Sequence, residues 1–556
     1  MAELRTEADA APRRAWPVHV AAGLLVVAIL GPLAWPGYAL SYDMVFVPRQ
    51  HLTWTLVAPA DALPRAVPLD AVVALANLAI PGWLLQRVAL AGLVYAAAVG
   101  AASLVPSGRV LPRVVAAVGY VWTAYLAERL LLGQWSLLCC YAALPWIVAA
   151  AIDIRRGARA AVPRLVVAAA AASLTPTGGL IATTAAAVLL LGRRPGRTAL
   201  AGLAAVAALN APWVVASLVA SAGAASDPAG VAAFAARAEN STGTLGALLG
   251  TGGVWNRLTT PDSRMWTSTP VVTVVLLVLA VIGWPRLRSA LAPGVAYRLA
   301  GLAAGGFVLA IAGAVPPGAA ALRFLVVQVP GAGLLRDGQK FLAGYVLLLV
   351  LCVASGVARL ADRFGAEVAG VVGVGAVLLP LFAMPDLAWG GAGALHPVRY
   401  PADWATVERI VDAAPGDVLA LPFGEYRRYG WTGGRVVIDP LPRYLAAPVV
   451  ADDTLVVGAV TVAGEDRRAA RVREHLAAGG AAADLGVAWV VVEGPGVPPS
   501  ALAGLDRVYS GPELTLYRNP AAVPAGHPTT ARRAAMLLAY TLALGMVVGA
   551  AAWWST

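Results

Sequence analysis

The chain has 556 residues, of which 59% are hydrophobic and only 13% are charged. Soluble proteins usually carry about 25% charged residues, and no soluble core could hide this much apolar surface, so most of the chain must lie in a lipid bilayer. The formal net charge of +11 does not indicate a nucleic-acid partner, because the arginines lie mostly in short loops between apolar segments, where they orient membrane helices.

Apolar segments follow one another over residues 17–384, after a polar tail at 1–16, and a last one lies within 532–556. About twenty apolar residues cross a bilayer, so the pattern predicts about twelve membrane-spanning helices. The predicted spans are 17–35, 83–105, 111–128, 137–153, 163–176, 178–192, 198–220, 269–284, 298–316, 341–358, 366–384 and 534–553. The longest polar stretches between them are predicted outer loops at 36–68, 221–268 and 317–340.

The arginines predict the side of the membrane on which each loop lies. If the tail at 1–16 is cytoplasmic, every short inner loop is basic, as the positive-inside rule requires. These loops contain Arg109, Arg113, Arg155, Arg156, Arg159, Arg193, Arg194, Arg197, Arg286, Arg288, Arg359 and Arg363. We therefore expect a multi-pass protein of the cytoplasmic membrane. Arg532 and Arg533, on the outer side of the last span, are the exception.

Residues 385–531 differ in composition from the rest and predict a small extracytoplasmic α/β domain near the C-terminus. Strand-like runs occur in DVLALPF, RVVIDP, LGVAWVVVEG and ELTLYRN, and helical spacing occurs in ADWATVERIVDAA and EDRRAARVREHLAA. Strands that alternate with helices are typical of an α/β domain. The predicted fold class is an α-helical multi-pass membrane protein that carries this domain.

The first outer loop contains the best candidate for a catalytic group. Asp43 lies a few residues after the first span, in YALSYDMVFVPRQ. A carboxylate at that level could accept the proton of an acceptor hydroxyl as a general base. Alternatively, Asp43 caps a helix or pairs with Arg49 at the membrane surface, and spacing alone favours this structural role.

A second candidate site lies in LLRDGQKF, where Arg336, Asp337 and Lys340 precede a span. Helix N-termini bind anions, and a lysine there adds a compact positive charge that suits phosphate. Lys340 is the only lysine in a chain rich in Ala, Gly, Val and Arg, a composition that suggests a GC-rich actinobacterial genome. The structural alternative makes Asp337 a helix cap and Lys340 an ordinary interfacial side chain.

Further polar residues lie near the outer ends of two spans, in ERLLLGQWS. There we interpret Glu128 and Arg129 as a plain ion pair and Trp135 as part of an aromatic belt. Arg323 and Gln328, which lie ahead of Lys340 in the sequence, could extend the polar site. The residues predicted to contact a substrate are Arg49, Gln134, Trp135, Arg323, Arg336, Asp337 and Lys340.

Motifs of several other enzyme classes are absent from the sequence. It contains no P-loop, no GxSxG elbow and no HExxH, and its five histidines do not pair at metal-ligand spacing. We therefore predict no metal site and no cofactor. The spans contain few charges at mid-depth, which argues against a proton- or ion-coupled transporter.

This layout resembles the GT-C superfamily of membrane glycosyltransferases. Within it, PGAGLLRDGQKFLAGYVLLL is similar to a stretch of actinobacterial arabinofuranosyltransferase-like proteins. LGVAWVVVEG followed by LTLYRNP is similar to the end of the outer domain in membrane proteins that glycosylate lipoteichoic acid.

The resemblance implies a polyprenyl-phosphate-linked sugar as donor and a cell-envelope glycan or glycolipid as acceptor, with membrane lipids as surroundings. It gives Asp43 the role of catalytic base, and Arg336 and Lys340 that of holding the lipid phosphate. Many members have an adjacent acidic pair, whereas this chain has the single acid Asp43 at that position, so the resemblance does not support a metal-dependent mechanism.

Two other functions remain open from the sequence. A transporter of lipid-linked sugars or envelope polymers would need a continuous polar path across the membrane. A non-catalytic subunit of an envelope-assembly complex would leave Asp43 and Lys340 far apart. An enzyme would have both residues in one outer cavity that opens sideways to lipid.

Overall fold

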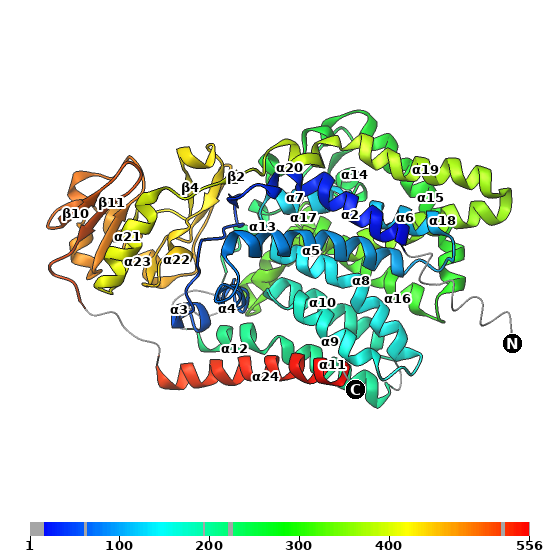
Figure 1. The fold of residues 1–556 in the computed structure, drawn as a ribbon, viewed down its shortest axis with the longest axis horizontal. Coiled ribbons are helices and arrows are strands. Elements are labelled where there is room, and N and C mark those ends of the chain that lie inside the picture. The colour runs from blue at the N-terminus through cyan, green and yellow to red at the C-terminus, as the bar shows by residue number, and fades with distance from the viewer. Residues whose placement is uncertain (1–15, 60–63, 193–194, 221–225, 524–528, 555–556) are drawn as a thin grey trace.

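The computed structural model describes residues 16–554 apart from 60–63, 193–194, 221–225 and 524–528. A helical membrane domain makes up most of the molecule, and a smaller α/β domain, at the left in Figure 1, lies at one end of it. The predicted fold class is confirmed. The predicted tail at 1–16 lies outside the described residues except for Trp16, where helix α2 begins.

Within the described ranges, nine helical segments are long and apolar enough to cross a membrane. They are Trp16–Ala34 (α2 with η1), Gly82–Ser103 (α5), Val110–Leu131 (α6 and α7), Trp135–Arg155 (α8), Ser268–Ala290 (α15), Val295–Ala312 (α16), Gly338–Phe364 (η5 and α18), Ala366–Ala383 (α19) and Thr530–Trp553 in α24. A tenth is possible, because α11 (Arg197–Leu209) and α12 (Ala211–Val219) follow one another with a bend of 48°.

The remaining two predicted spans are shorter helices, α9 (Ala161–Ala172) and α10 (Pro176–Leu190). At a rise of about 1.5 Å per residue, α9 is roughly 18 Å long, well short of the ~30 Å hydrocarbon core. The prediction of about twelve full-length spans is therefore corrected to nine or ten. Both segments are apolar, but the turn at 173–175 separates them into helices of 12 and 15 residues.

The three predicted outer loops contain helices of their own. The first has α3 (Trp54–Val57) and α4 (Leu69–Ala76), and the second has α13 (Gly230–Ala233), α14 (Gly243–Leu249), η2 (Arg257–Thr259) and η3 (Asp262–Met265). The third is largely the helix α17 (Pro316–Gln328), followed by η4 (Ala332–Leu335). The first two positions of α17 are prolines. They fit a helix start, because the N–H groups of the first turn have no partner within the helix and proline lacks one.

The α/β domain is built on a five-stranded sheet of order β10-β11-β9-β3-β6. Its strands are β3 (Val418–Leu421), β6 (Val449–Val450), β9 (Trp489–Val492), β10 (Asp506–Ser510) and β11 (Thr515–Arg518). Strand β3 is parallel to both neighbours, and β11 is antiparallel to β9 and β10. Two longer helices accompany the sheet, α21 (Ala402–Ala413) and α23 (Arg467–Ala477).

Two hairpins stand outside this sheet, namely β4–β5 (Tyr426–Arg428 and Val436–Ile438) and β7–β8 (Leu455–Val457 and Val460–Val462). The β7–β8 hairpin packs its apolar side chains against the second outer loop, where Phe234 and Trp255 meet it. The hairpin thus covers part of the membrane domain's end.

The first outer loop is joined to the α/β domain by backbone pairing. Its strand β1 (Tyr38–Ala39) pairs antiparallel with β2 (Pro397–Val398). The N–H of Tyr42 donates to the carbonyl of Val436 at 2.7 Å, and the N–H of Ile438 donates to the carbonyl of Tyr42 at 2.9 Å. The residue after Tyr42 is Asp43, so the domain and the membrane helices together fix its position.

Candidate active site

A cavity of about 310 Å³ lies where the membrane domain meets the α/β domain. Its size is at the lower end of the range of small-molecule sites. Six of the predicted site residues line it, namely Asp43, Gln134, Trp135, Arg336, Asp337 and Lys340. Its wall also contains residues that the sequence analysis did not select, among them Arg65, Thr175, Thr177, Phe234, Glu425, Tyr426, Arg443 and Asp453.

Asp43 is held at the cavity wall by one partner from each domain. One carboxylate oxygen accepts a hydrogen bond from the hydroxyl of Tyr426 at 2.6 Å, and the other accepts from the side-chain amide of Gln134 at 3.2 Å. Burial and the neighbouring Asp43 carboxylate raise the pKa of Tyr426 well above its usual value, so this hydroxyl stays protonated and donates. A carboxylate has about four lone-pair sites, so Asp43 can still accept a hydrogen bond from a further donor.

The backbone of the Asp43 loop rests directly on Gly133. The N–H of Asp43 donates to the carbonyl of Leu132 at 3.2 Å. Gly133 has φ +75°, and a Cβ there would overlap the backbone of Ser41 and Met44. Only glycine fits this close approach without strain.

Gly133→Ala should therefore displace the Asp43 loop without touching the carboxylate. The left-handed backbone alone costs about 1–2 kcal/mol, and a displacement of ~1 Å costs about 10²-fold in turnover where the displaced group is catalytic. Turnover and thermal unfolding of the variant in detergent would measure both effects. The matched control is Gly108→Ala, where an added Cβ meets nothing within 4 Å; equal effects of the two substitutions would contradict the packing argument.

Opposite Asp43, the segment before α18 presents Asp337 and Lys340. The carboxylate of Asp337 is 3.6 Å from the ammonium of Lys340 and accepts two hydrogen bonds from the guanidinium of Arg129, at 2.8 and 3.0 Å. Asp337 makes no side-chain cap to the helical turn that follows it. It is an ion-pair partner, and the helix-cap alternative is wrong.

Arg129 connects residues on both sides of the cavity from a position behind its wall. It lies in α7 (Ala124–Leu131), is completely buried, and also donates to the side-chain oxygens of Gln134, at 2.7 Å, and Gln339. Glu128, its neighbour in sequence, accepts instead from the N–H of Val254 at 3.2 Å. The side chain of Gln339 links the two residues, because it accepts from Arg129 and its amide donates to Glu128 at 3.3 Å. The predicted direct Glu128–Arg129 ion pair is therefore wrong.

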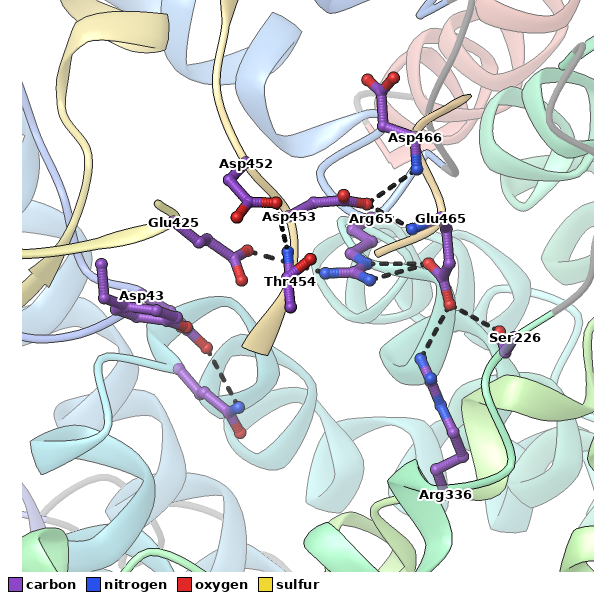
Figure 2. A network of polar contacts seen from close by, with 12 residues as sticks. Asp43, Arg65, Ser226, Arg336, Glu425, Asp452, Asp453, Thr454, Glu465 and Asp466 are labelled. Carbon is purple, nitrogen blue, oxygen red and sulfur yellow. Dashed lines mark hydrogen bonds and ion pairs between the residues drawn. The ribbon is translucent and has the colours of Figure 1, made fainter. Parts of the chain in front are cut away.

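A network of acids and arginines closes the side of the cavity nearest the β7–β8 hairpin (Figure 2). Arg65 from the first outer loop and Arg336 both donate to the carboxylate of Glu465, at 2.8 and 3.0 Å. The hydroxyl of Ser226 donates to the same carboxylate at 2.7 Å. Asp453 accepts from the N–H of Glu465.

Glu425 brings a titratable acid to the cavity from the α/β domain. It lies just beyond the end of β3, and its carboxylate is 3.7 Å from the guanidinium of Arg65. Burial raises its pKa to about 7, against the attraction of Arg65 and with added repulsion from Asp43. Glu425 therefore gains its negative charge near neutral pH.

Two predicted contacts do not reach the cavity. Arg49 and Arg323 are exposed and do not line it. Arg323 lies on α17, where Leu322 and Val326 make the buried contacts with Val231, so the arginine points elsewhere. Since the third loop folds as a helix, proximity to Lys340 in sequence does not bring Arg323 beside it.

The cavity residues that the sequence analysis missed come from distant segments. Glu425 and Tyr426 follow a buried parallel strand, in LALPFGEY. Polar residues beyond the carboxyl end of such a strand often line a site, and this signal was available. Arg65 and Asp453 have no comparable local signal, because only the docking of the two domains brings them together.

One further group of possible metal ligands lies outside the cavity wall. His51, Glu408 and Asp412 have ligand atoms within 4.8 Å of one another, and the imidazole of His51 is 3.0 Å from a Glu408 oxygen. None of the three lines the cavity. No local pattern connects these residues, because His51 is more than 350 residues from the two acids.

The fold of this chain is similar to that of a protein of known structure. No protein-family model matches the chain, and no curated protein matches it in sequence. Among solved structures, a cryo-EM structure of arabinofuranosyltransferase AftD from Mycobacteria matches with a TM-score of 0.57 over 92% of this chain, at 18% sequence identity. The chain shares the overall fold of that structure. It covers 41% of the AftD chain, so it corresponds in length to less than half of that protein.

Proposed function

We propose that this protein is a membrane glycosyltransferase that transfers a sugar from a polyprenyl-phosphate donor to a cell-envelope glycan or glycolipid. The observation that carries the proposal is the single cavity lined by both Asp43 and Lys340. A scaffold subunit has no need to bring these two residues together. The shared fold with an arabinofuranosyltransferase supports the same reaction class.

In this reaction Asp43 accepts the proton of the acceptor hydroxyl as its oxygen attacks the anomeric carbon of the donor. The bond from that carbon to the phosphate oxygen breaks, and its electrons leave with the polyprenyl phosphate. Arg336 and Lys340 stabilise the negative charge that develops on the leaving phosphate. Tyr426 and Gln134 hold Asp43 in place. Direct displacement inverts the anomeric configuration.

The arginine distribution supports catalysis on the outer face. The cavity lies at the end of the membrane domain that carries the α/β domain, whereas Arg155, Arg197, Arg288 and Arg363 lie at span ends away from it. By the positive-inside rule the arginine-rich end is cytoplasmic. The α/β domain would then be extracytoplasmic and would position the acceptor.

A long apolar groove supports a lipid-linked donor. A cavity of about 820 Å³ is lined mainly by apolar residues of α5, α8 and α9. On α8 its lining residues recur at helical spacing from Cys139 to Asp153, and Trp135 and Ser136 of the active-site cavity continue the same face. An isoprenoid chain whose phosphate lies near Lys340 could extend down this face of α8.

Gly92→Phe should block this groove. Gly92 lines it, and an added Cβ meets nothing within 4 Å, so the ring would fill free space without distorting α5. The KM for a long-chain polyprenyl donor should rise by roughly tenfold, since several methylene groups at about 0.8 kcal/mol each lose their contacts. A donor with a three-isoprene chain should be unaffected.

The control for that substitution is Gly375→Phe on α19, which also has open space around its Cβ but does not line the groove. Steady-state transfer with both donors measures the chain-length dependence. Equal KM values for the long-chain donor in the two variants would remove the groove from the donor site.

The titration of Glu425 predicts a pH dependence of donor binding. Below its pKa of about 7 the side chain is neutral, and above it a negative charge faces the cavity. The donor's phosphodiester remains an anion across this range, so the KM for donor should rise by roughly fivefold between pH 6 and pH 8. Glu425→Gln should remove that rise; a rise of the same size in the variant would show that another group titrates.

The proposed function is tested with radiolabelled polyprenyl-phosphate sugars and membranes that contain or lack the protein. Donors of arabinose, mannose, glucose and galactose cover the candidate sugars. Incorporation of label into membrane glycans that depends on the protein supports the proposal. Incorporation unchanged by deletion for all four donors contradicts it and favours the transporter or scaffold functions.

A further inference from the structure

Two arginines of the cavity wall are bound to one carboxylate of the chain itself. Arg65 and Arg336 both line the cavity, and each donates to the side chain of Glu465, at 2.8 and 3.0 Å. Glu465 is almost fully buried, with 4% of its side chain exposed. Half of the Arg65 side chain remains exposed. The arrangement is shown in Figure 2.

The surroundings of Glu465 resemble those of a bound phosphate. Two guanidinium groups grip its oxygens, and the hydroxyl of Ser226 donates a further hydrogen bond at 2.7 Å. Arginine forks and hydroxyl donors are the groups that bind phosphate in proteins. Burial alone would raise the pKa of Glu465, but Arg65 and Arg336 hold it below its usual value, so the site holds a carboxylate at neutral pH.

The backbone at Glu465 is anchored independently of its side chain. The carboxylate of Asp453 accepts from the N–H groups of Glu465 and Asp466, at 2.5 and 2.9 Å. The N–H of Ala463 donates to the side chain of Asp227 at 2.7 Å. The side chain of Glu465 can therefore leave the arginines by rotation while the β7–β8 hairpin stays docked.

We propose that Arg65 and Arg336 form the binding site for the donor's phosphate group and that Glu465 occupies this site until the donor displaces it. This inference rests on the proposed function in taking a lipid phosphate as the ligand. It adds Arg65 to the binding residues and makes Glu465 a competitor of the substrate. Donor affinity is then set by the difference in binding free energy between the donor's phosphate and the Glu465 carboxylate at the same two arginines.

A purely structural ion pair predicts the opposite sign. If Glu465 only joins the two domains, removing its charge weakens the docking of the hairpin and leaves donor affinity unchanged or lower. If it competes with phosphate, removing its charge frees both arginines and raises affinity. Glu465→Gln keeps the size and an acceptor oxygen, so it separates these outcomes.

The experiment uses the full chain in detergent micelles, with farnesyl phosphate as the probe and farnesol as the uncharged control. Binding is followed by intrinsic tryptophan fluorescence or calorimetry, and thermal unfolding is recorded for every variant. Glu465→Gln should bind farnesyl phosphate about tenfold more tightly, because the phosphate then no longer has to displace a charged hydrogen-bond partner from the two arginines. Arg65→Gln should weaken binding by a similar factor, and farnesol binding should not change.

The matched control is Glu474→Gln, which removes an exposed acid from the neighbouring helix α23 and should leave binding unchanged. If Glu465→Gln does not fold, Glu465→Asp retains the charge with a shorter reach and should give a smaller gain. Equal or weaker binding in a folded Glu465 variant overturns the inference.

The competition by Glu465 and the proposed sugar transfer can be rejected independently of each other. Tighter farnesyl phosphate binding by Glu465→Gln, without sugar transfer from any donor, would support the anion site and reject the glycosyltransferase. Normal sugar transfer with no change of affinity in Glu465→Gln would reject only the competition.

Discussion

Replacing Asp43 by asparagine should reduce sugar transfer by roughly 10²–10⁴-fold, the usual contribution of a positioned general base. Asparagine has nearly the same size and can still accept the hydrogen bond that Tyr426 donates to Asp43 at 2.6 Å. The loop should therefore keep its position, and expression and thermal unfolding should be close to those of the native protein. The measurement is turnover with saturating labelled donor.

The control for this substitution is Tyr426→Phe, which removes one positioning hydrogen bond and leaves the carboxylate. We expect a loss of about tenfold or less, from less exact placement of the base. The KM for donor should change little in Asp43→Asn, because the proposed role of Asp43 involves the acceptor and not the phosphate. Full activity of Asp43→Asn would falsify the general-base role, and another acid of the cavity, Glu425, would then be the next candidate.

Sequence patterns located Asp43 and Lys340 because each lies beside the end of a span. At that level the chain leaves the bilayer, and a charged side chain can face a cavity without entering hydrocarbon. Six of the predicted residues meet in one wall for this reason. Arg49 and Arg323 were selected because they lie near Asp43 and Lys340 in the sequence, but that nearness does not specify the direction of a side chain.

Helix geometry explains why Arg129 was assigned to the wrong partner. Residues i and i+1 of a helix point about 100° apart, so Glu128 and Arg129 cannot share one face. Arg129 instead reaches Asp337, more than 200 residues later. No local pattern identifies such a partner, since the packing of α7 against the segment before α18 creates it.

The α/β domain was predicted at the level of elements and not of their pairing. The runs DVLALPF, LGVAWVVVEG and ELTLYRN form β3, β9 and β11 of the central sheet, as apolar β-rich segments should. RVVIDP forms β5, which pairs with β4 outside that sheet. The two-residue strand β6 and the pairing of β1 with β2 are too short to leave a periodic signal.

Arg129→Met should be the most destabilising single change at the site. Arg129 is completely buried and donates two hydrogen bonds to Asp337, whose side chain is 8% exposed. Removing the guanidinium leaves a buried carboxylate whose nearest remaining cation, Lys340, is 3.6 Å away. Breaking a buried pair in this way costs about 3–5 kcal/mol, so thermal unfolding should begin at a clearly lower temperature, and transfer should be lost with it.

A double variant and a surface control decide whether that loss has the proposed cause. Arg129→Met combined with Asp337→Leu removes both charges, and well-packed apolar replacements of a buried pair are often neutral, so much of the thermal stability should return. Transfer should stay low, because Gln134 and Lys340 lose their supports. Arg164→Met breaks an Arg–Asp contact of the same length, 2.8 Å, that is 45% exposed at the arginine and should cost no more than about 1 kcal/mol. If the double variant is as unstable as Arg129→Met alone, the stability lies in the bonds of Arg129 to Gln134 and Gln339 and not in its pairing with Asp337.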